Sequence, residues 1–310
     1  MLMQVISTYP IETIYVNHEI IHNTFVIKMF ERRGVVFESD IASIPDGALV
    51  VISAHGTGPS YFTSLRQRHI RWIDAACPLV EKVHREAREL IAKGYHILYI
   101  GKRWHQEALG IIDEGESHFT LIEKIEDVEK LVNLRHSEVW RIYSWKILDP
   151  SQAQDDKTQK LALLTQTTLS VDDTDILIRE IQARYPDIVL PKAWDICYAT
   201  TNRQKAVKAL AEKCDLIFVV GSSSSSNSNK LRDVAENLWK KAYLIEDASE
   251  IDATWLTGIS TVWVTAWASG PEELVEWVVD YLVSLGGDFV SELRVVEEKV
   301  EFPYTLKILT

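Results

Sequence analysis

The segment DLIFVVGSSSSSNSN, residues 215–229, decides the fold that the sequence predicts. Its apolar run, 216–220, is typical of a buried strand, and a helical pattern begins by Lys230. Only a glycine, a serine run and two asparagines separate the two, which leaves no slack for a flexible linker. A tight turn that feeds a helix N-terminus offers unpaired N–H groups, hydroxyl donors and the positive end of the helix dipole. We therefore predict that residues 221–229 bind an anion.

The same alternation of strand, polar cluster and helix recurs along the chain. It predicts an α/β fold, because short apolar runs alternate with amphipathic stretches. Ligands bind beyond the carboxyl ends of the strands in such folds, so we expect the polar clusters to meet at one pocket. The predicted strands are 48–54, 96–101, 161–165, 215–221 and 261–266, and the predicted helices are 79–92, 172–183 and 230–241.

Charge and composition exclude several classes of protein. The 310 residues carry a net charge of −12, which disfavours nucleic acid and anionic membranes as partners. The longest clean apolar run, 49–54, is far below the roughly 20 residues of a membrane-spanning helix, and the N-terminus lacks the basic region of a signal peptide. Three cysteines without a CxxC pair indicate a reducing compartment. We predict a soluble cytoplasmic protein.

Two stretches depart from the alternation. Residues 135–160 have mixed polarity and then a polar run, which we interpret as a surface insertion with a loop near 149–159. The tail, 282–310, ends in an alternating pattern that predicts one returning strand.

Two of the three cysteines stand where a thiolate is stabilised. Cys77 and Cys197 lie at predicted strand–loop–helix junctions among polar residues, where helix N–H groups favour the thiolate. Cys214 lies where a helix leads into a core strand, and we interpret it as structural.

Three histidines adjoin small or polar residues near predicted strand ends: His22, His55 and His105. A single histidine of this kind is more often a satisfied core or surface group. Three of them together indicate either a phosphate-binding set or a metal-binding set, and the sequence leaves both open.

Eight segments together resemble the 4-hydroxy-3-methylbut-2-enyl diphosphate reductase family, iron–sulfur enzymes of the methylerythritol phosphate route to isoprenoids. The most distinctive are TQTTLSVDDT at 165–174 and DICYATTNRQ at 195–204. The others are NHEIIHN at 17–23, SAHG at 53–56, DAACPLVEKVH at 74–84, HQE at 105–107, SSNSN at 225–229 and TAWASGPE at 265–272.

The resemblance implies a three-lobed, trefoil-like α/β fold around a central [4Fe–4S] cluster. The expected lobes are 1–77, 78–193 with the insertion, and 194–281, followed by the returning strand 282–310. It implies that Cys77 and Cys197 bind the cluster, that Glu107 donates a proton, and that Thr167 holds and helps protonate the substrate hydroxyl. The diphosphate grip that it implies consists of His22, His55, His105, Ser225, Ser226, Asn227 and Ser269. A ferredoxin or flavodoxin would supply the electrons.

Two differences from the family pattern bear on this interpretation. The family carries its first cluster cysteine in a PRGFCAGV-like loop, and no such loop occurs here, so we expect a truncated first lobe and a missing third ligand. Trp267 stands where the family has glycine, and we expect its indole to reshape the pocket.

These differences leave two functions open. In the first, the chain is the reductase, and an upstream start, a ligand other than cysteine or a second chain completes the cluster. In the second, a divergent paralogue keeps the diphosphate pocket without the complete cluster and binds or transforms another phosphorylated metabolite. A site with two thiolates would expose the cluster or bind Zn²⁺ instead.

Overall fold

The computed structural model describes residues 2–18, 23–131, 160–191, 195–267, 270–288, 290–293, 295 and 308–309. These residues divide into two compact units. The first unit comprises 1–40, 168–170 and 197–306, and the second comprises 41–167, 171–196 and 307–310. The predicted insertion at 135–160 lies outside the described residues except for Lys160, which begins a strand.

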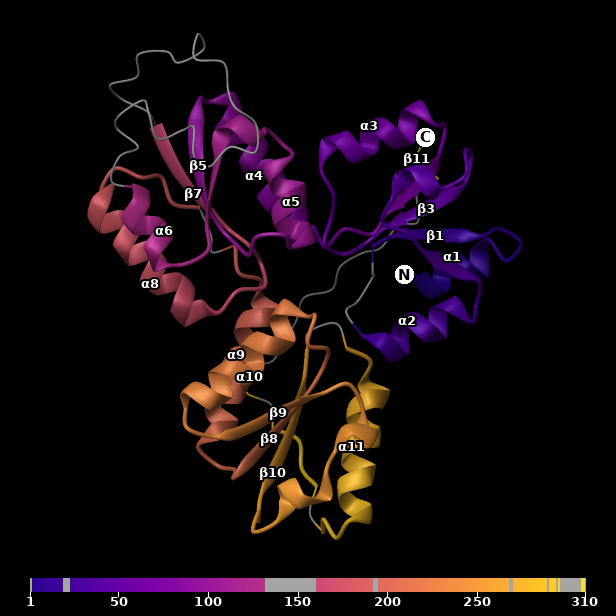
Figure 1. Cartoon of the computed structure of the whole chain (residues 1–310), viewed down its shortest axis with the longest axis vertical. Helices are drawn as coiled ribbons and strands as arrows, with labels where there is room; N and C mark the ends of the chain where they lie inside the picture. Colours follow the sequence, from indigo (N-terminus) through magenta and orange to yellow (C-terminus); the bar gives the residue numbers. More distant parts are fainter. Residues whose placement is uncertain are drawn as a thin grey trace. The chain divides into compact units, whose positions relative to one another are not determined.

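The C-terminal part of the first unit is a three-layer α/β structure. Its parallel sheet has the order β10-β8-β9, formed by Val262–Ala266, Leu216–Val220 and Lys241–Ile245. Helices α9 (Tyr198–Ala211) and α10 (Ser226–Asn237) cover one face, and α11 (Glu272–Ser284) covers the other (Figure 1). All five residues of β8 are buried because both faces are covered.

The N-terminal part of the first unit contains α1 (Leu2–Thr8), β1 (Ile14–Asn17), α2 (Thr24–Glu31) and β2 (Val35–Phe37). Strands β1 and β2 are parallel, with Ile14 opposite Val35. Asn23 caps α2 by accepting a hydrogen bond from the amide of Val26.

The second unit is built around the parallel sheet β6-β5-β7. Its strands are Phe119–Ile122, Tyr95–Ile100 and Lys160–Thr165. Helices α4 (Pro78–Ala92) and α5 (Gln106–Ile112) pack on one face, while α6 (Ile125–Lys130) and α8 (Val171–Arg184) lie on the other (Figure 1). Two further parallel strands of this unit, β3 (Leu49–Ile52) and β4 (Arg71–Asp74), are joined by α3 (Pro59–Gln67).

The predicted strands and helices are confirmed to within a few residues, with two differences. Helix α10 begins at Ser226 and not at Lys230, because Ser225 caps it and the serine and asparagine side chains are tolerated in its first turn. It ends at Asn237, and Lys241 begins β9. In the tail, residues 282–284 still belong to α11, and only β11 (Ile308–Leu309) pairs antiparallel with β4 among the described residues.

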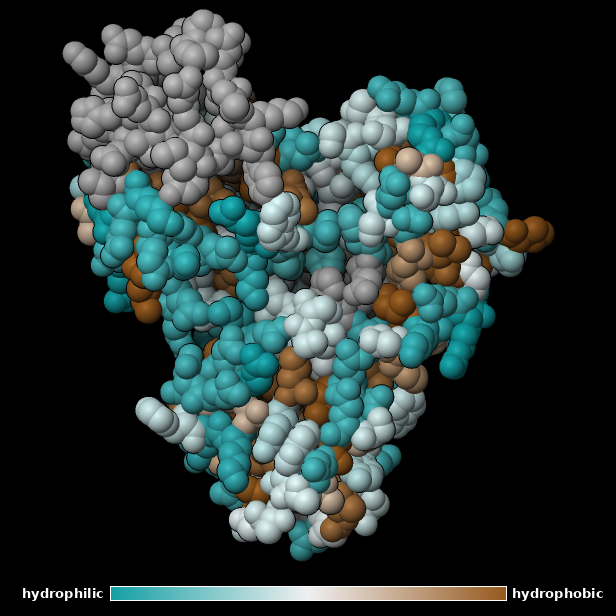
Figure 2. Space-filling view, in the orientation of Figure 1, coloured by the Kyte–Doolittle hydropathy of each residue, from teal (hydrophilic) through white to brown (hydrophobic). Residues whose placement is uncertain are grey.

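Polar residues lie mainly at the surface and apolar residues in the core, as expected for a globular chain of this composition. On the face drawn in Figure 2, hydrophilic residues cover most of the described surface, and apolar residues form small groups. Within the described ranges no helix combines the length and the apolar character that crossing a bilayer requires.

Candidate active site

Glu107 and Thr167 form the central pair of the second unit. They follow β5 and β7, which are parallel neighbours, so their carboxyl ends reach the same edge of the sheet. Thr167 donates two hydrogen bonds to the Glu107 carboxyl group, from its amide to Oε1 at 2.7 Å and from its hydroxyl to Oε2 at 2.9 Å. Both side chains are buried. The predicted convergence of strand ends is thereby confirmed for these two strands.

Burial sets the protonation of Glu107. Its pKa is raised to about 7, mainly because burial disfavours the charged form and also because Asp195 nearby is negative. The two hydrogen bonds from Thr167 favour the carboxylate and oppose this shift. A carboxyl group with a pKa near neutrality can hold a proton and release it, as a general acid requires.

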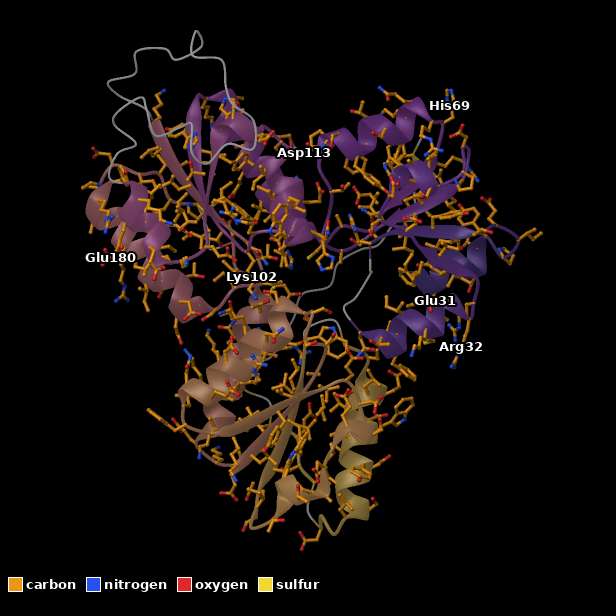
Figure 3. All side chains as sticks on the ribbon, viewed as in Figure 1. Glu31, Arg32, His69, Lys102, Asp113 and Glu180 are labelled. Atoms are coloured by element: carbon orange, nitrogen blue, oxygen red, sulfur yellow. The ribbon has the colours of Figure 1, made fainter. Side chains whose placement is uncertain are left out.

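His105 and His55 lie beside this pair in the same unit. Their rings meet edge to face with centroids 5.5 Å apart. His105 caps α5, because its Nδ1 accepts a hydrogen bond from the amide of Glu107. Figure 3 labels Lys102 and Asp113, the residues that bracket the segment containing His105 and Glu107.

His55 follows β3 and precedes Gly56, whose φ of +71° is in the left-handed region. A Cβ at Gly56 would lie 3.1 Å from Cγ1 of Val80 and 3.3 Å from Nε2 of His84. The turn therefore requires glycine, and its close contact with α4 fixes the backbone that carries His55.

Cys77 and Cys197 each occupy the N-cap of a helix, as predicted. Cys77 precedes α4 in the second unit, and its amide donates to the carbonyl of Ala54 at 3.0 Å. Cys197 precedes α9 in the first unit, and its sulfur accepts a hydrogen bond from the amide of Thr200. None of the three cysteines forms a disulfide, and Cys214 is buried. Thiols at helix N-termini fit the donor chemistry of an iron site, although no three described His, Cys, Asp or Glu side chains are grouped to hold a metal ion.

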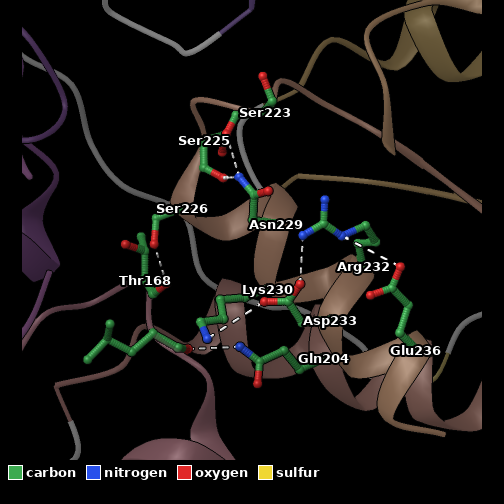
Figure 4. Close-up of polar contacts among 11 residues, drawn as sticks. Thr168, Gln204, Ser223, Ser225, Ser226, Asn229, Lys230, Arg232, Asp233 and Glu236 are labelled. Atoms are coloured by element: carbon green, nitrogen blue, oxygen red, sulfur yellow. Dashed lines mark hydrogen bonds and ion pairs between the residues drawn. The ribbon is translucent and has the colours of Figure 1, made fainter. Parts of the chain in front are cut away.

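Figure 4 shows polar contacts of the serine turn, residues 221–229, in the first unit. Ser225 caps α10 by accepting from the amide of Ser228, and Ser226 donates to the carbonyl of Thr168. Asn229 donates to two carbonyl oxygens of the turn, those of Ser223 at 2.6 Å and Ser225 at 2.8 Å. The turn is therefore held by its own side chains and is not a flexible linker.

Two polar side chains of the serine turn are buried and have no hydrogen-bond partner among the described residues. They are Asn227, through both Oδ1 and Nδ2, and Ser228, through its hydroxyl. Asn227 is only 6% exposed and lies in the first turn of α10, the end of the helix at which the dipole favours negative charge. A buried amide without a partner is costly unless a ligand satisfies it. The donor set fits an anion, which is the prediction made for this segment.

Trp267 packs beneath the serine turn, and its expected effect on the shape of the pocket stays a prediction. It is 3% exposed and packs in the core with Phe218 and Leu274. A Cβ on Gly221 would lie 3.3 Å from its ring and would also collide with the hydroxyl of Ser228, so glycine is needed there. The indole supports the serine turn from the core side.

Several residues that the sequence reasoning gave no role complete these two groups. In the second unit, buried Asp195 accepts hydrogen bonds from the amide of Thr165 and from Nζ of Lys82, at 2.9 and 3.0 Å. Burial raises the pKa of Asp195 to about 6, while these two hydrogen bonds oppose the shift. In the first unit, Gln204 donates to the carbonyl of Leu169 at 2.8 Å. The sequence could have indicated these residues, because DICYATTNRQ and TQTTLSVDDT contain further polar residues.

Predicted site residues His22 and Ser269 lie outside the described residues.

Comparison with known families decides the membership of the chain. Residues 1–283 match the model of the LytB protein family. The chain belongs to this family. The match spans nearly all the described helices and strands of both units.

Curated members of the LytB family resemble the chain over most of its length. The protein from Bordetella pertussis is 43% identical over 94% of this chain and 82% of its own length. The protein from Mannheimia succiniciproducens is 42% identical over 95% of this chain and 88% of its own. Both are named 4-hydroxy-3-methylbut-2-enyl diphosphate reductase. The predicted assignment to a family of reductases, and hence of oxidoreductases, is confirmed.

Solved structures of reductases share the fold. The E-1-hydroxy-2-methyl-but-2-enyl-4-diphosphate reductase from Plasmodium falciparum has a TM-score of 0.79 and 33% identity, over 90% of this chain and 81% of that one. A structure of (E)-4-hydroxy-3-methyl-but-2-enyl diphosphate reductase has a TM-score of 0.61 and 25% identity, over 91% of this chain and 92% of that one. These reductases have a trefoil-like, three-lobed α/β fold, and the predicted fold class is confirmed.

Proposed function

We propose that this chain reduces (E)-4-hydroxy-3-methylbut-2-enyl diphosphate to isopentenyl and dimethylallyl diphosphate. The observation that carries the proposal is Glu107, a buried carboxyl group with a pKa of about 7 held by Thr167, in a chain whose relatives are named as this reductase. The reaction consumes two electrons and two protons, because the C–O bond is replaced by C–H and the oxygen leaves as water.

Glu107 supplies the proton that the leaving hydroxyl needs. A hydroxide ion is a poor leaving group, so protonation at the oxygen lowers the barrier of C–O cleavage. Thr167 holds the carboxyl group in one orientation through two hydrogen bonds and, in this proposal, its hydroxyl also contacts the substrate hydroxyl. Burial of both side chains limits access of bulk water to the proton.

The diphosphate is bound by uncharged and imidazole donors. The serine turn contributes Ser225, Ser226 and Asn227, and the side-chain amide of Asn227 has no partner within the part of the chain that the structure describes. We assign His55 and His105 to the same substrate, with His22 and Ser269 as the sequence predicts. The chain has a net charge of −12, so the anion must be bound by a local set of donors. Hydroxyl, amide and imidazole groups can each donate hydrogen bonds to phosphate oxygens.

Cys77 and Cys197 would hold a [4Fe–4S] cluster, which when bound supplies electrons and a Lewis-acidic iron for the allylic oxygen. Both sulfurs lie at helix N-caps, where the N–H groups of the first turn favour a thiolate. The missing third cysteine ligand stays a prediction. So do the lobe boundaries, the cytoplasmic location and the ferredoxin- or flavodoxin-type donor, which we retain within this proposal.

Turnover tests the proposal directly. Protein purified without oxygen and supplied with a reduced viologen dye should convert the hydroxy diphosphate to the two isomeric diphosphates. Dye oxidation should stop when the substrate is omitted. Iron-loaded protein that binds the substrate and produces neither isomer would contradict the proposal and would favour the paralogue acting on another phosphorylated metabolite.

Asn227→Ala should abolish most of the stabilisation that diphosphate gives the protein. A ligand at 100 times its Kd adds about 2.7 kcal/mol to the free energy of unfolding, so inorganic diphosphate should raise the Tm of the wild type measurably. The substitution removes the unpartnered amide and leaves the cap at Ser225 intact. Asn237→Ala, an exposed change at the other end of α10, is the matched control. An equal Tm shift in wild type and Asn227→Ala would place the anion elsewhere.

A further inference from the structure

The segment Thr165–Thr167 is fixed by the backbone amide of each of its residues. The amide of Thr165 donates to Oδ2 of Asp195 at 2.9 Å, and that of Gln166 donates to the carbonyl of Ile100 at 2.8 Å. The amide of Thr167 donates to Glu107 at 2.7 Å. Two of these three acceptors are buried carboxylates, so the position of Thr167 depends on side chains as well as on the sheet.

At the edge of β7, the carboxylate of Asp195 accepts a hydrogen bond that a backbone carbonyl of a neighbouring strand would normally accept. Along this edge Val189 exchanges hydrogen bonds with β7, accepting from the amide of Leu163 and donating to the carbonyl of Leu161. The next amide on the same edge is that of Thr165, which no backbone carbonyl accepts in the described chain. The carboxylate of Asp195 accepts it instead. A buried amide without an acceptor would be costly, so this contact keeps the end of β7 in place.

Lys82 forms an ion pair with Asp195 that fixes the carboxylate beside the Thr165 amide. Its Nζ lies 3.0 Å from Oδ1, while Oδ2 receives the Thr165 amide, so the two oxygens have separate partners. The Asp195 side chain is fully buried, and a buried carboxylate that lost its cation would be strongly destabilised. Lys82 also lies 3.7 Å from Glu86, one turn further along α4, which provides a matched control.

We propose that Asp195, held by Lys82, is a positioning residue that fixes Thr165–Thr167 and thereby the hydrogen bonds of Thr167 to Glu107. The proposal rests on the role of Glu107 as the proton donor. It extends that role to an ion pair whose described hydrogen bonds reach Thr165, and not Glu107 or Thr167 themselves.

Besides Thr167, Asp195 acts on the Glu107 carboxyl group, because its negative charge raises the pKa of Glu107. Two further groups lie near Glu107. They are the buried phenol of Tyr99, whose own pKa is raised by burial and by the charges of Glu107 and Asp195, and the ring of His105, which accepts a hydrogen bond from the backbone amide of Glu107. Removal of the Asp195 charge therefore lowers the pKa of Glu107. Less of the acid is then protonated at neutral pH, and turnover recovers at lower pH.

Amide hydrogen exchange in the anaerobically purified protein tests the positioning without turnover. In Asp195→Ala we expect exchange at Thr165 and Thr167 to accelerate about tenfold or more, the scale of one hydrogen bond to a charged group, with Leu163 unchanged. Lys82→Met should show the same pattern more weakly. Asp195→Asn keeps an oxygen acceptor, so it should retain the protection of Thr165 while the pH profile of turnover shifts to lower pH.

Glu86→Gln is the control, because it removes the other carboxylate near Lys82 and leaves the Thr165 contact intact. Unchanged protection of Thr167 in folded Asp195→Ala, or an equal loss of protection in Glu86→Gln, would overturn the proposal. If Asp195→Ala does not fold, Lys82→Met and Asp195→Asn decide the question. The variants could show the expected exchange differences while the wild-type protein shows no turnover. That result would contradict the proposed function and leave the positioning role standing.

Discussion

Glu107→Gln is expected to lose about 10²- to 10⁴-fold in turnover, the usual contribution of general acid catalysis. Glutamine has the shape of the protonated carboxyl group and can still accept from Thr167 through its amide oxygen, so the fold and the Thr167 contact should persist. Its amide cannot give up a proton. Binding of diphosphate should change little, since other residues hold that group in the proposed mechanism.

The pH dependence follows from the same carboxyl group. Glu107 must be protonated to act as an acid, and its pKa is about 7. Turnover of the wild type should therefore fall as the pH rises through about 7 and should be highest below it. Glu107→Gln should lack this limb, because glutamine does not titrate.

Thr167→Val refines the pH test. It removes the hydroxyl bond, which favours the charged carboxylate, and leaves the backbone bond at 2.7 Å in place. The pKa of Glu107 should rise and the descending limb should move to higher pH. Glu116→Gln, an exposed change beyond the end of α5, should leave the profile unchanged.

These measurements separate catalysis from structure. Wild-type turnover in Glu107→Gln would remove the carboxyl group from the mechanism. Joint loss of turnover and of diphosphate-induced stabilisation would make Glu107 a structural residue, and the proton would then come from Thr167, a bound water or the substrate's own diphosphate.

The sequence predicts the elements of this site better than the contacts between them. Apolar runs followed by polar clusters locate the ends of β5 and β7, because parallel buried strands have an unmistakable composition. That Glu107 and Thr167 meet follows only from the pairing of β5 with β7, which periodicity cannot give, since residues 60 apart in sequence meet through sheet register.

Hydrogen bonds in which a side chain replaces a backbone partner are the features that the sequence predicts least well. Asp195 accepts an amide that a strand would normally accept, and nothing in its local sequence marks it for this contact. The start of α10 is similar: serine and asparagine favour turns and caps, and the hydrogen bonds of Ser225 and Asn229 decide where the turn ends. Trp267 shows the same limit for packing, because the space beside Gly221 is visible only in three dimensions.

Cys77→Ser and Cys197→Ser are each expected to remove most of the iron and sulfide from anaerobically purified protein, with turnover falling at least about 10²-fold. Serine is a preferred N-cap residue, so helices α4 and α9 should be preserved or stabilised by the change. A loss of iron would then reflect the missing thiolate and not a local unfolding. At Cys197 the hydroxyl can still accept from Thr200, so its backbone should stay in place.

Cys214→Ala is the matched control for both cysteine variants. Cys214 is buried between α9 and β8, and burial raises the pKa of its thiol, which disfavours the thiolate that iron requires. Its removal should cost some stability and no iron. Wild-type protein that stays colourless and iron-free after anaerobic reconstitution would contradict the assignment of the cluster. Bleaching by Cys214→Ala at unchanged fold would instead place the iron near Cys214, because a thiol that only packs in the core cannot affect a metal bound elsewhere.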